Sequence, residues 1–165
     1  MVQLRLDPRR NPGQLTFMST IETSLLSIGS AHELAPLLAA CAQERGRGAP
    51  RRPDEFYAEL LLNDRTASIL GARLDGHLVG YAVFFDLPNT MNGRRIGQLD
   101  EMFVIQDSRE KGVGKALLDA VSAEAVGRDW DELRWVVPEK PPVARALAER
   151  FGHPAGWSVF SVPLG

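Results

Sequence analysis

The stretch that decides the fold is "FVIQDSREKGVGKALLDAV", residues 103–121. A short apolar run gives way to a polar turn, and Gly112 and Gly114 then stand at the start of a pattern typical of a helix. Each glycine weakens a helix by roughly 0.5–1 kcal/mol relative to alanine, so two of them at a helix start require a reason. The first N–H groups of a helix have no partner within it, and a residue without a Cβ lets a ligand approach them. Because the helix dipole adds partial positive charge there, residues 110–115 are a candidate site for a phosphate or pyrophosphate.

Two better-known phosphate loops do not match this stretch. A Walker A loop has a glycine five residues before its Gly-Lys pair and a hydroxyl residue after it, and here Arg109 and Ala116 stand at those positions. The dinucleotide fingerprint has a third glycine where this chain has Leu117. Arg109 and Lys115 nevertheless add positive charge near the turn. A plain strand-to-helix junction remains the alternative for this stretch taken alone.

The whole chain has the composition of one globular domain. It has 165 residues, of which 44% are hydrophobic and 24% are charged. We expect one domain over residues 18–165, preceded by a disordered extension over residues 1–17, which is polar and broken by Pro8 and Pro12. No apolar run approaches the roughly 20 residues of a membrane span, so a cytoplasmic protein without membrane contact is expected.

Charge and cysteine content exclude several classes of function. The formal charge is -2 and the arginine pairs are isolated, which disfavours a nucleic-acid partner. Cys41 is the single cysteine, so the chain has no internal disulfide and no cysteine-rich zinc site, and we expect no metal cofactor. The apolar residues around Cys41 predict a buried thiol on a helix face.

Periodicity and turn residues predict the order β-α-α-β-β-β-α-β-α-β. Ser30, with Glu33 three residues later, has the spacing of a capping box, and Asp75-Gly76 is typical of a tight hairpin turn. The predicted strands cover 22–29, 68–74, 77–87, 94–105, 132–137 and 156–164, and the predicted helices cover 31–44, a segment opened by Pro53-Asp54, 112–127 and 142–151. This order predicts an α/β fold with a mixed, largely antiparallel central sheet and helices on both faces.

The motif Arg109-x-x-Gly112-x-Gly114, after the strand end at 102–104, resembles the acetyl-CoA-binding motif of the GNAT superfamily of N-acetyltransferases. The element order resembles that fold over residues 20–165. The resemblance implies that the backbone of the strand end binds the pantetheine arm of acetyl-CoA and that the turn amides bind its pyrophosphate. The implied cofactor-binding residues are Met102, Phe103, Val104, Arg109, Glu110, Lys111, Gly112, Val113, Gly114 and Lys115. The family's usual glycine after the arginine is Glu110 here, so we expect its carboxylate to point outward.

Three shorter stretches narrow the resemblance. "GQLDEMFV" (97–104), "VVPE" (136–139) and "GWSVF" (156–160) are similar to segments of the spermidine/spermine and thialysine acetyltransferases. The acidic segment that precedes the strand in that subgroup is "PNTMNGRR" here, without a carboxylate. Several ammonium groups need several carboxylates, so we expect a smaller or less cationic acceptor, such as one whose own carboxylate pairs with Arg94 or Arg95.

Acetyl transfer to an amine needs a proton acceptor for the ammonium, a donor for the oxyanion and a proton for the leaving thiolate. Asp100 and Glu101 are adjacent on a strand, so they should point to opposite faces unless a bulge re-aims them. By the resemblance, Asp100 is the first candidate for the base or ammonium anchor and Glu101 is the second. A solvated strand carboxylate without a role is the alternative.

The group that protonates the thiolate is missing from its usual place. By the resemblance, Pro141 and Ala148 stand where the family has an asparagine and a tyrosine, and neither can donate a proton. The two tyrosines are Tyr57 and Tyr81, and the strand pattern predicts Tyr81 in the core. Water, or another group such as His153, is left as the donor.

The predicted function is acetyl-CoA-dependent N-acetylation of a small primary amine by direct transfer. The resemblance implies a homodimer and acetyl-CoA as co-substrate. Two alternatives stay open: a catalytically degenerate acyl-CoA-binding sensor or regulatory domain, and a protein N-terminal acetyltransferase.

Overall fold

Strand β3 (His77–Pro88) explains the layers of the molecule, because its residues are buried on both faces over most of its length. A strand that is covered on both sides reads as a continuous apolar run, as this one does. In the computed structural model, which describes residues 19–46, 55–138, 142–156 and 158–162, β3 lies at the centre of a five-stranded sheet. The predicted α/β class, with a largely antiparallel sheet, is confirmed.

The strand order is β1-β2-β3-β4-β5, and the sheet is antiparallel except at its last pair. The other strands are β1 (Ile21–Leu25), β2 (Ala67–Leu74), β4 (Arg95–Val104) and β5 (Leu133–Trp135). β5 runs parallel to β4 and pairs with it only over Gly97 to Leu99. The parallel pair is therefore short, and β4 continues beyond it.

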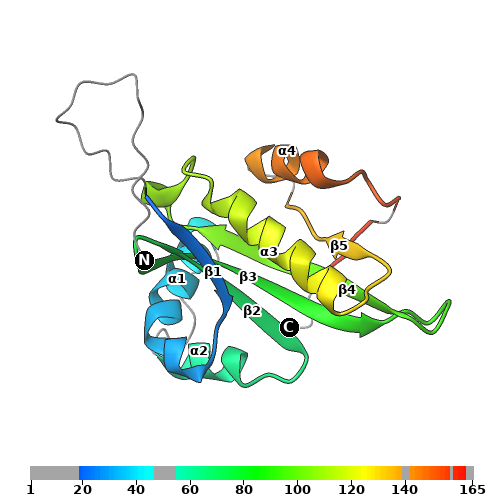
Figure 1. The fold of residues 1–165 in the computed structure, drawn as a ribbon, viewed down its shortest axis with the longest axis horizontal. Coiled ribbons are helices and arrows are strands. Elements are labelled where there is room, and N and C mark those ends of the chain that lie inside the picture. The colour runs from blue at the N-terminus through cyan, green and yellow to red at the C-terminus, as the bar shows by residue number, and fades with distance from the viewer. Residues whose placement is uncertain (1–18, 47–54, 139–141, 157, 163–165) are drawn as a thin grey trace, which may run out of the picture.

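Helices cover both faces of the sheet (Figure 1). α1 (Ala31–Glu44) and α2 (Glu55–Leu62) pack on one face, and α3 (Val113–Gly127) packs on the other, with α4 (Pro142–Phe151) beside α3. Neighbouring strand residues alternate between the two cores, as Ile69 on the α1/α2 side and Leu70 on the α3 side illustrate. The residues that fill the α1/α2 core include Leu34, Tyr81, Val83 and Phe103, and those of the α3 core include Phe84, Leu99, Leu117 and Val121.

Local sequence signals predicted several elements closely. The helices predicted over 31–44 and 142–151 have those bounds, and the helix predicted over 112–127 begins one residue later. At the β2–β3 hairpin, Asp75 and Gly76 have φ angles of 51° and 84°, so the predicted two-residue turn is confirmed. The extension over residues 1–17 and the helix start at Pro53-Asp54 lie outside the described residues.

Three local predictions are wrong in part. Ser30 is the N-cap residue but makes no side-chain cap hydrogen bond, and Glu33, its expected partner in the capping box, accepts two hydrogen bonds of 2.5 Å from Arg73 of β2. The first strand ends at Leu25, and a short 3-10 turn (Ile28–Ser30) follows it. The described residues of the stretch 156–164 form no strand, and Phe160 is 89% exposed. The apolar pattern of that stretch favours a strand, but a strand also needs a paired neighbour, which sequence pattern alone cannot supply.

Candidate functional site

A β-bulge in β4 shapes the candidate site. Leu99 pairs with Phe84 and Glu101 pairs with Val83, so Asp100 is one extra residue without an opposite partner on β3. Before the bulge, the backbone of Gly97 and Leu99 bonds toward β5, through Gly97 N–H to Glu132 O and Val136 N–H to Leu99 O. The bulge therefore lies where the parallel pairing with β5 stops.

Beyond the bulge, β4 presents an open edge. Ile105 N–H donates to Val79 O on the side of β3, and the carbonyl of Val104 points the other way and accepts from the Arg109 side chain at 2.9 Å. By the alternation of a strand, Met102 faces the same open side as Val104. Among the described residues, no strand pairs with β4 on this side beyond Leu99. An extended ligand could therefore pair with the backbone of this edge.

The open edge leads into the turn over residues 109–115, which we call the glycine turn, and into the start of α3. Gly112 is the N-cap residue and has a φ of 88°, and Glu110 has a φ of 62°. Ala116 N–H is the first amide of α3 that bonds back, to Gly112 O. The amides of residues 113–115 thus have the usual position of unpaired first-turn donors, and no acidic residue stands in that turn. Positive-φ turns of this kind form concave amide groups that suit anions.

Arg109 and Lys115 were both expected to add positive charge near this turn, but their side chains lie on different sides of the sheet. Arg109 lies over the ring of Phe103, at 5.8 Å from its centroid, and pairs with Glu44 of α1 at 2.6 Å. Its guanidinium is therefore on the α1/α2 side of the sheet, whereas α3 covers the other side. Lys115 pairs with Asp119 at 2.5 Å along α3 and stays largely exposed. Of the two cations, only Lys115 flanks the helix start directly.

Glu101 is held by two partners on the α1/α2 side. Its Oε2 accepts from Arg45 at 2.6 Å, and its Oε1 accepts from the hydroxyl of Tyr81. Tyr81 is fully buried, as predicted, and burial together with the nearby Glu101 charge raises the pKa of its hydroxyl far above its usual value. Tyr81 consequently stays a hydrogen-bond donor at any physiological pH. Sequence reasoning missed Arg45, because no local pattern connects residues that are 56 positions apart.

Asp100 is exposed and more weakly engaged than Glu101. Its carboxylate accepts from the Gln98 side chain at 3.4 Å, which places it on the side of Gln98. Gln98 stands opposite Phe85, and Phe85 packs on the α1/α2 core, so both carboxylates lie on that side. The two carboxylates do not face opposite sides as they would in a regular strand, because a bulge re-aims them, which is the exception allowed for in the sequence analysis. Asp100 is the one whose oxygen atoms remain accessible to a ligand.

Other predicted residues lie as follows. Ala148 is half-buried on α4, and Leu147 of the same helix packs on the α3 core, so α4 lies over the start of α3 near Gly114. His153 is exposed just after α4, and Pro141 lies outside the described residues. The structure thus shows no donor at position 148.

The two arginines expected to pair with an acceptor carboxylate have partners within the chain. Arg94 pairs with Asp131 at 2.6 Å, and Arg95 pairs with Asp86 at 2.5 Å. An acceptor carboxylate that binds Arg94 or Arg95 would therefore compete with these aspartates, and the expected pairing stays a prediction. Asp86 lies on β3 and Asp131 lies just before β5, so the stretch 88–95 alone did not reveal either partner.

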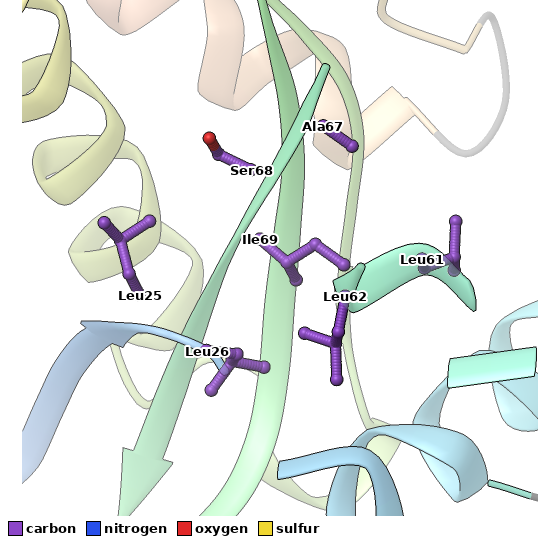
Figure 2. Close-up of a pocket in the computed structure, with 7 residues that line it drawn as sticks. All are labelled: Leu25, Leu26, Leu61, Leu62, Ala67, Ser68 and Ile69. Atoms are coloured by element: carbon purple, nitrogen blue, oxygen red, sulfur yellow. The ribbon is translucent and has the colours of Figure 1, made fainter. Parts of the chain in front are cut away.

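A small pocket that is lined mostly by aliphatic residues lies away from these residues. Figure 2 shows it at the end of β1, between α2 and the start of β2, with a volume of about 160 Å³. It is lined by Leu25, Leu26, Leu61, Leu62, Ala67, Ser68 and Ile69. Pockets for drug-sized ligands measure about 300–1,000 Å³, so this pocket is too small for a nucleotide cofactor. The glycine turn is near Ile21, at the opposite end of β1.

Two classes of site find no support among the described residues. No group of three or more histidine, cysteine, aspartate or glutamate side chains there is arranged to hold a metal ion. No helix of this part of the chain has the length and apolar character needed to cross a membrane.

Known proteins resemble the chain in both sequence and fold. Residues 32–153, well over half of the chain, match the acetyltransferase (GNAT) family. The crystal structure of a ribosomal-protein-alanine N-acetyltransferase from Brucella melitensis biovar Abortus 2308 shares 43% identity with a TM-score of 0.80, over 88% of this chain and 99% of that chain. The chain has no match among curated protein sequences.

Two further solved structures share the fold at lower identity. One is a probable acetyltransferase, with 18% identity, a TM-score of 0.78 and coverage of 87% of this chain and 98% of that chain. The other is an aminoglycoside acetyltransferase from an uncultured soil metagenomic sample, with 19% identity, a TM-score of 0.73 and coverage of 88% and 99%. None of these similarities favours the spermidine/spermine subgroup in particular. The family match and the 43% identity over nearly the whole chain show that it belongs to the GNAT family of acetyltransferases.

Proposed function

We propose that the protein transfers the acetyl group of acetyl-CoA to a primary amine, with a small molecule as the first candidate for the acceptor. The observation that carries this proposal is the open edge of β4, which leads directly into the first-turn amides of α3. An acyl-CoA has an extended amide-containing arm joined to a pyrophosphate. The edge offers backbone partners to the arm, and the helix start offers amides and partial positive charge to the pyrophosphate.

In this arrangement the backbone of Met102 and Val104 binds the arm and the turn amides bind the pyrophosphate. The side chain of Phe103 packs in the α1/α2 core and so holds this part of β4 against that core. The full set of proposed cofactor-binding residues is Met102, Phe103, Val104, Arg109, Glu110, Lys111, Gly112, Val113, Gly114 and Lys115. Arg109 belongs to this set through its position in the turn, since its side chain is held by Glu44 and Val104 O.

Asp100 is the proposed base or ammonium anchor, because it is exposed and projects from the bulge at one end of the open edge. Asp100 takes a proton from the ammonium, directly or through water, and the neutral amine attacks the thioester carbonyl and forms the C–N bond. The C–S bond breaks, the nitrogen loses its second proton to water, and the thiolate takes a proton. Glu101 is the second candidate, but both of its oxygen atoms are already engaged.

The leaving thiolate can take its proton from water. A thiol has a pKa of about 8.5, so water can protonate the leaving group near neutral pH. A positioned general acid typically raises the rate by about 10²–10⁴-fold. Because Ala148 cannot act as such an acid, we expect slow turnover.

A protein N-terminus is the second candidate for the acceptor. The observation that favours it is the 43% identity to a ribosomal-protein-alanine N-acetyltransferase. The α-amino group of a peptide is also a primary amine, with an ordinary pKa of about 7.7–8.0. Such a group needs less help from a base than a lysine-like amine does.

The test is release of free CoA thiol from acetyl-CoA, measured with two panels of acceptors. One panel holds small primary amines, including aminoglycosides and diamines, and the other holds short peptides that begin with alanine. Turnover with the first panel supports a small-molecule acceptor, and turnover restricted to the second supports the protein acceptor. Tight CoA binding without turnover in either panel would contradict acetyl transfer and favour an acyl-CoA sensor.

A further inference from the structure

The C-terminal end of α1 contacts both ends of the open edge of β4. Glu44 and Arg45 are adjacent and carry opposite charges, and each forms an ion pair with a 2.6 Å contact. Glu44 pairs with Arg109 in the glycine turn, and Arg45 pairs with Glu101 beside the bulge. We call Glu44 and Arg45 together the α1 clamp.

On the side of the turn, the clamp acts through Arg109. The Arg109 guanidinium donates to the carbonyl of Val104 at 2.9 Å and to Glu44 at 2.6 Å, and it covers the Phe103 ring. A planar guanidinium with several donors in fixed directions can hold two acceptors at once. It therefore ties the last residues of β4 to the turn that follows and to α1.

On the side of the bulge, the clamp acts through Glu101. Arg45 occupies one carboxylate oxygen, and the buried Tyr81 hydroxyl occupies the other. A carboxylate fixed at both oxygens cannot rotate freely, so the peptide that carries it is fixed as well. That peptide directly follows Asp100, the extra residue of the bulge.

The geometry points to a role in positioning rather than in overall stability. The paired side chains are 26–44% exposed, and exposed ion pairs contribute only about 0.2–1 kcal/mol each. We propose that Glu44 and Arg45 are positioning residues that hold the edge over residues 101–104 and the turn over 109–115 in one geometry before acetyl-CoA binds. A binding site that is already in its bound geometry loses less free energy on ligand binding. This inference rests on the proposed function, because the ligand it concerns is an acyl-CoA.

The direction in which CoA affinity changes when Glu44 is removed separates this positioning role from direct binding of the pyrophosphate by Arg109. If the Arg109 side chain were a pyrophosphate ligand, removing Glu44 would free its charge and raise the affinity for CoA. If Arg109 instead links the turn to α1, removing Glu44 makes the turn more mobile and lowers that affinity. The expected loss of CoA affinity is about 1.4- to five-fold for Glu44→Gln and for Arg45→Gln, which corresponds to the free energy of one exposed ion pair.

The experiment uses the full chain and four variants: Glu44→Gln, Arg45→Gln, the conservative Arg45→Lys, and Glu132→Gln as a control. Glu132 pairs with Arg134 at 3.0 Å and similar exposure, away from the clamp. CoA affinity is measured by calorimetry, kcat and KM are measured with acetyl-CoA, and amide hydrogen exchange is measured in the free protein. We expect a higher KM for acetyl-CoA in both glutamine variants, with unchanged kcat in Glu44→Gln. We also expect faster exchange at 101–104 and 109–115 and partial recovery in Arg45→Lys.

The outcomes distinguish the two proposals. If wild-type protein binds CoA and both clamp variants match Glu132→Gln in affinity and in exchange, the clamp is overturned and the proposed function stands. Higher affinity in Glu44→Gln also overturns the clamp. If the wild-type protein binds no CoA, the proposed function itself fails, and the clamp's role in positioning a cofactor site fails with it.

Discussion

The two glycines at the start of α3 should respond to alanine with opposite signs. Gly112 has a φ of 88°, a conformation that costs an L-residue about 1–2 kcal/mol. A Cβ at this position would meet Ile21 Cδ1 at 3.7 Å, an ordinary contact, so the cost comes from the backbone alone. Alanine restricts the unfolded chain and returns about 0.4–1 kcal/mol. Gly112→Ala should therefore lower the free energy of unfolding by about 1 kcal/mol.

Gly114 lies in the first turn of α3 with an ordinary helical backbone. A Cβ there would meet Leu147 Cδ2 at 3.6 Å, again an ordinary contact. Alanine is favoured over glycine in a helix by about 0.8–1.0 kcal/mol, so Gly114→Ala should raise stability by up to that amount. The two variants should differ by about 2 kcal/mol.

Urea denaturation of both variants measures this difference, and in a chain of this size 1 kcal/mol corresponds to about 2–4 °C in Tm. A Gly112→Ala variant that is more stable than wild type would refute the left-handed turn. The same pair also tests the cofactor site: Gly114→Val adds bulk where the amides must be reached, and it should weaken CoA binding in calorimetry more than Gly114→Ala does. Equal affinity in a folded Gly114→Val variant would contradict binding at the turn amides.

Three further predictions follow from single side chains. Glu110 has a φ of 62° and adds a negative charge to the turn, so Glu110→Gly should raise both stability and CoA affinity, whereas Glu110→Gln should raise affinity only; equal CoA affinity in all three proteins would count against anion binding there. Asp100→Asn should reduce turnover and leave CoA affinity nearly intact, and undiminished turnover across pH would transfer the role to Glu101. The hydrogen bond from Arg73 lowers the pKa of Glu33, so this pair stabilises the fold above pH 4.5 and its contribution is lost as the pH falls through the lowered pKa. The stability difference between wild type and Glu33→Gln, measured by urea denaturation, should accordingly shrink in acid, and a difference that grows would be inconsistent with the pair.

Sequence reasoning succeeded where the determining interactions are local. The helix over residues 31–44 follows from apolar periodicity, and the β2–β3 turn follows from the conformational tolerance of Asp75-Gly76. The glycine turn was recognisable because its residues are contiguous. These features need no knowledge of what packs against them.

The remaining features depend on partners far away in the chain. The bulge at Asp100 has neither glycine nor proline to announce it, since it arises from the register between β3 and β4. The Arg45–Glu101 pair spans 56 positions, and the Arg73–Glu33 pair, which replaces the expected cap at Ser30, spans 40. Such contacts become visible only when the sheet and helices are assembled.

The register of β4 has a consequence for insertions and deletions. Leu99 and Glu101 pair with consecutive residues of β3, so a chain lacking the codon for Asp100 could form an uninterrupted ladder with the same residues in each core. The sheet itself thus does not require residue 100. A one-codon deletion should still give a folded protein, in which β4 is straighter and β5 can pair further along it. In a lineage free to lose that codon, its retention would indicate selection on the reaction rather than on the fold.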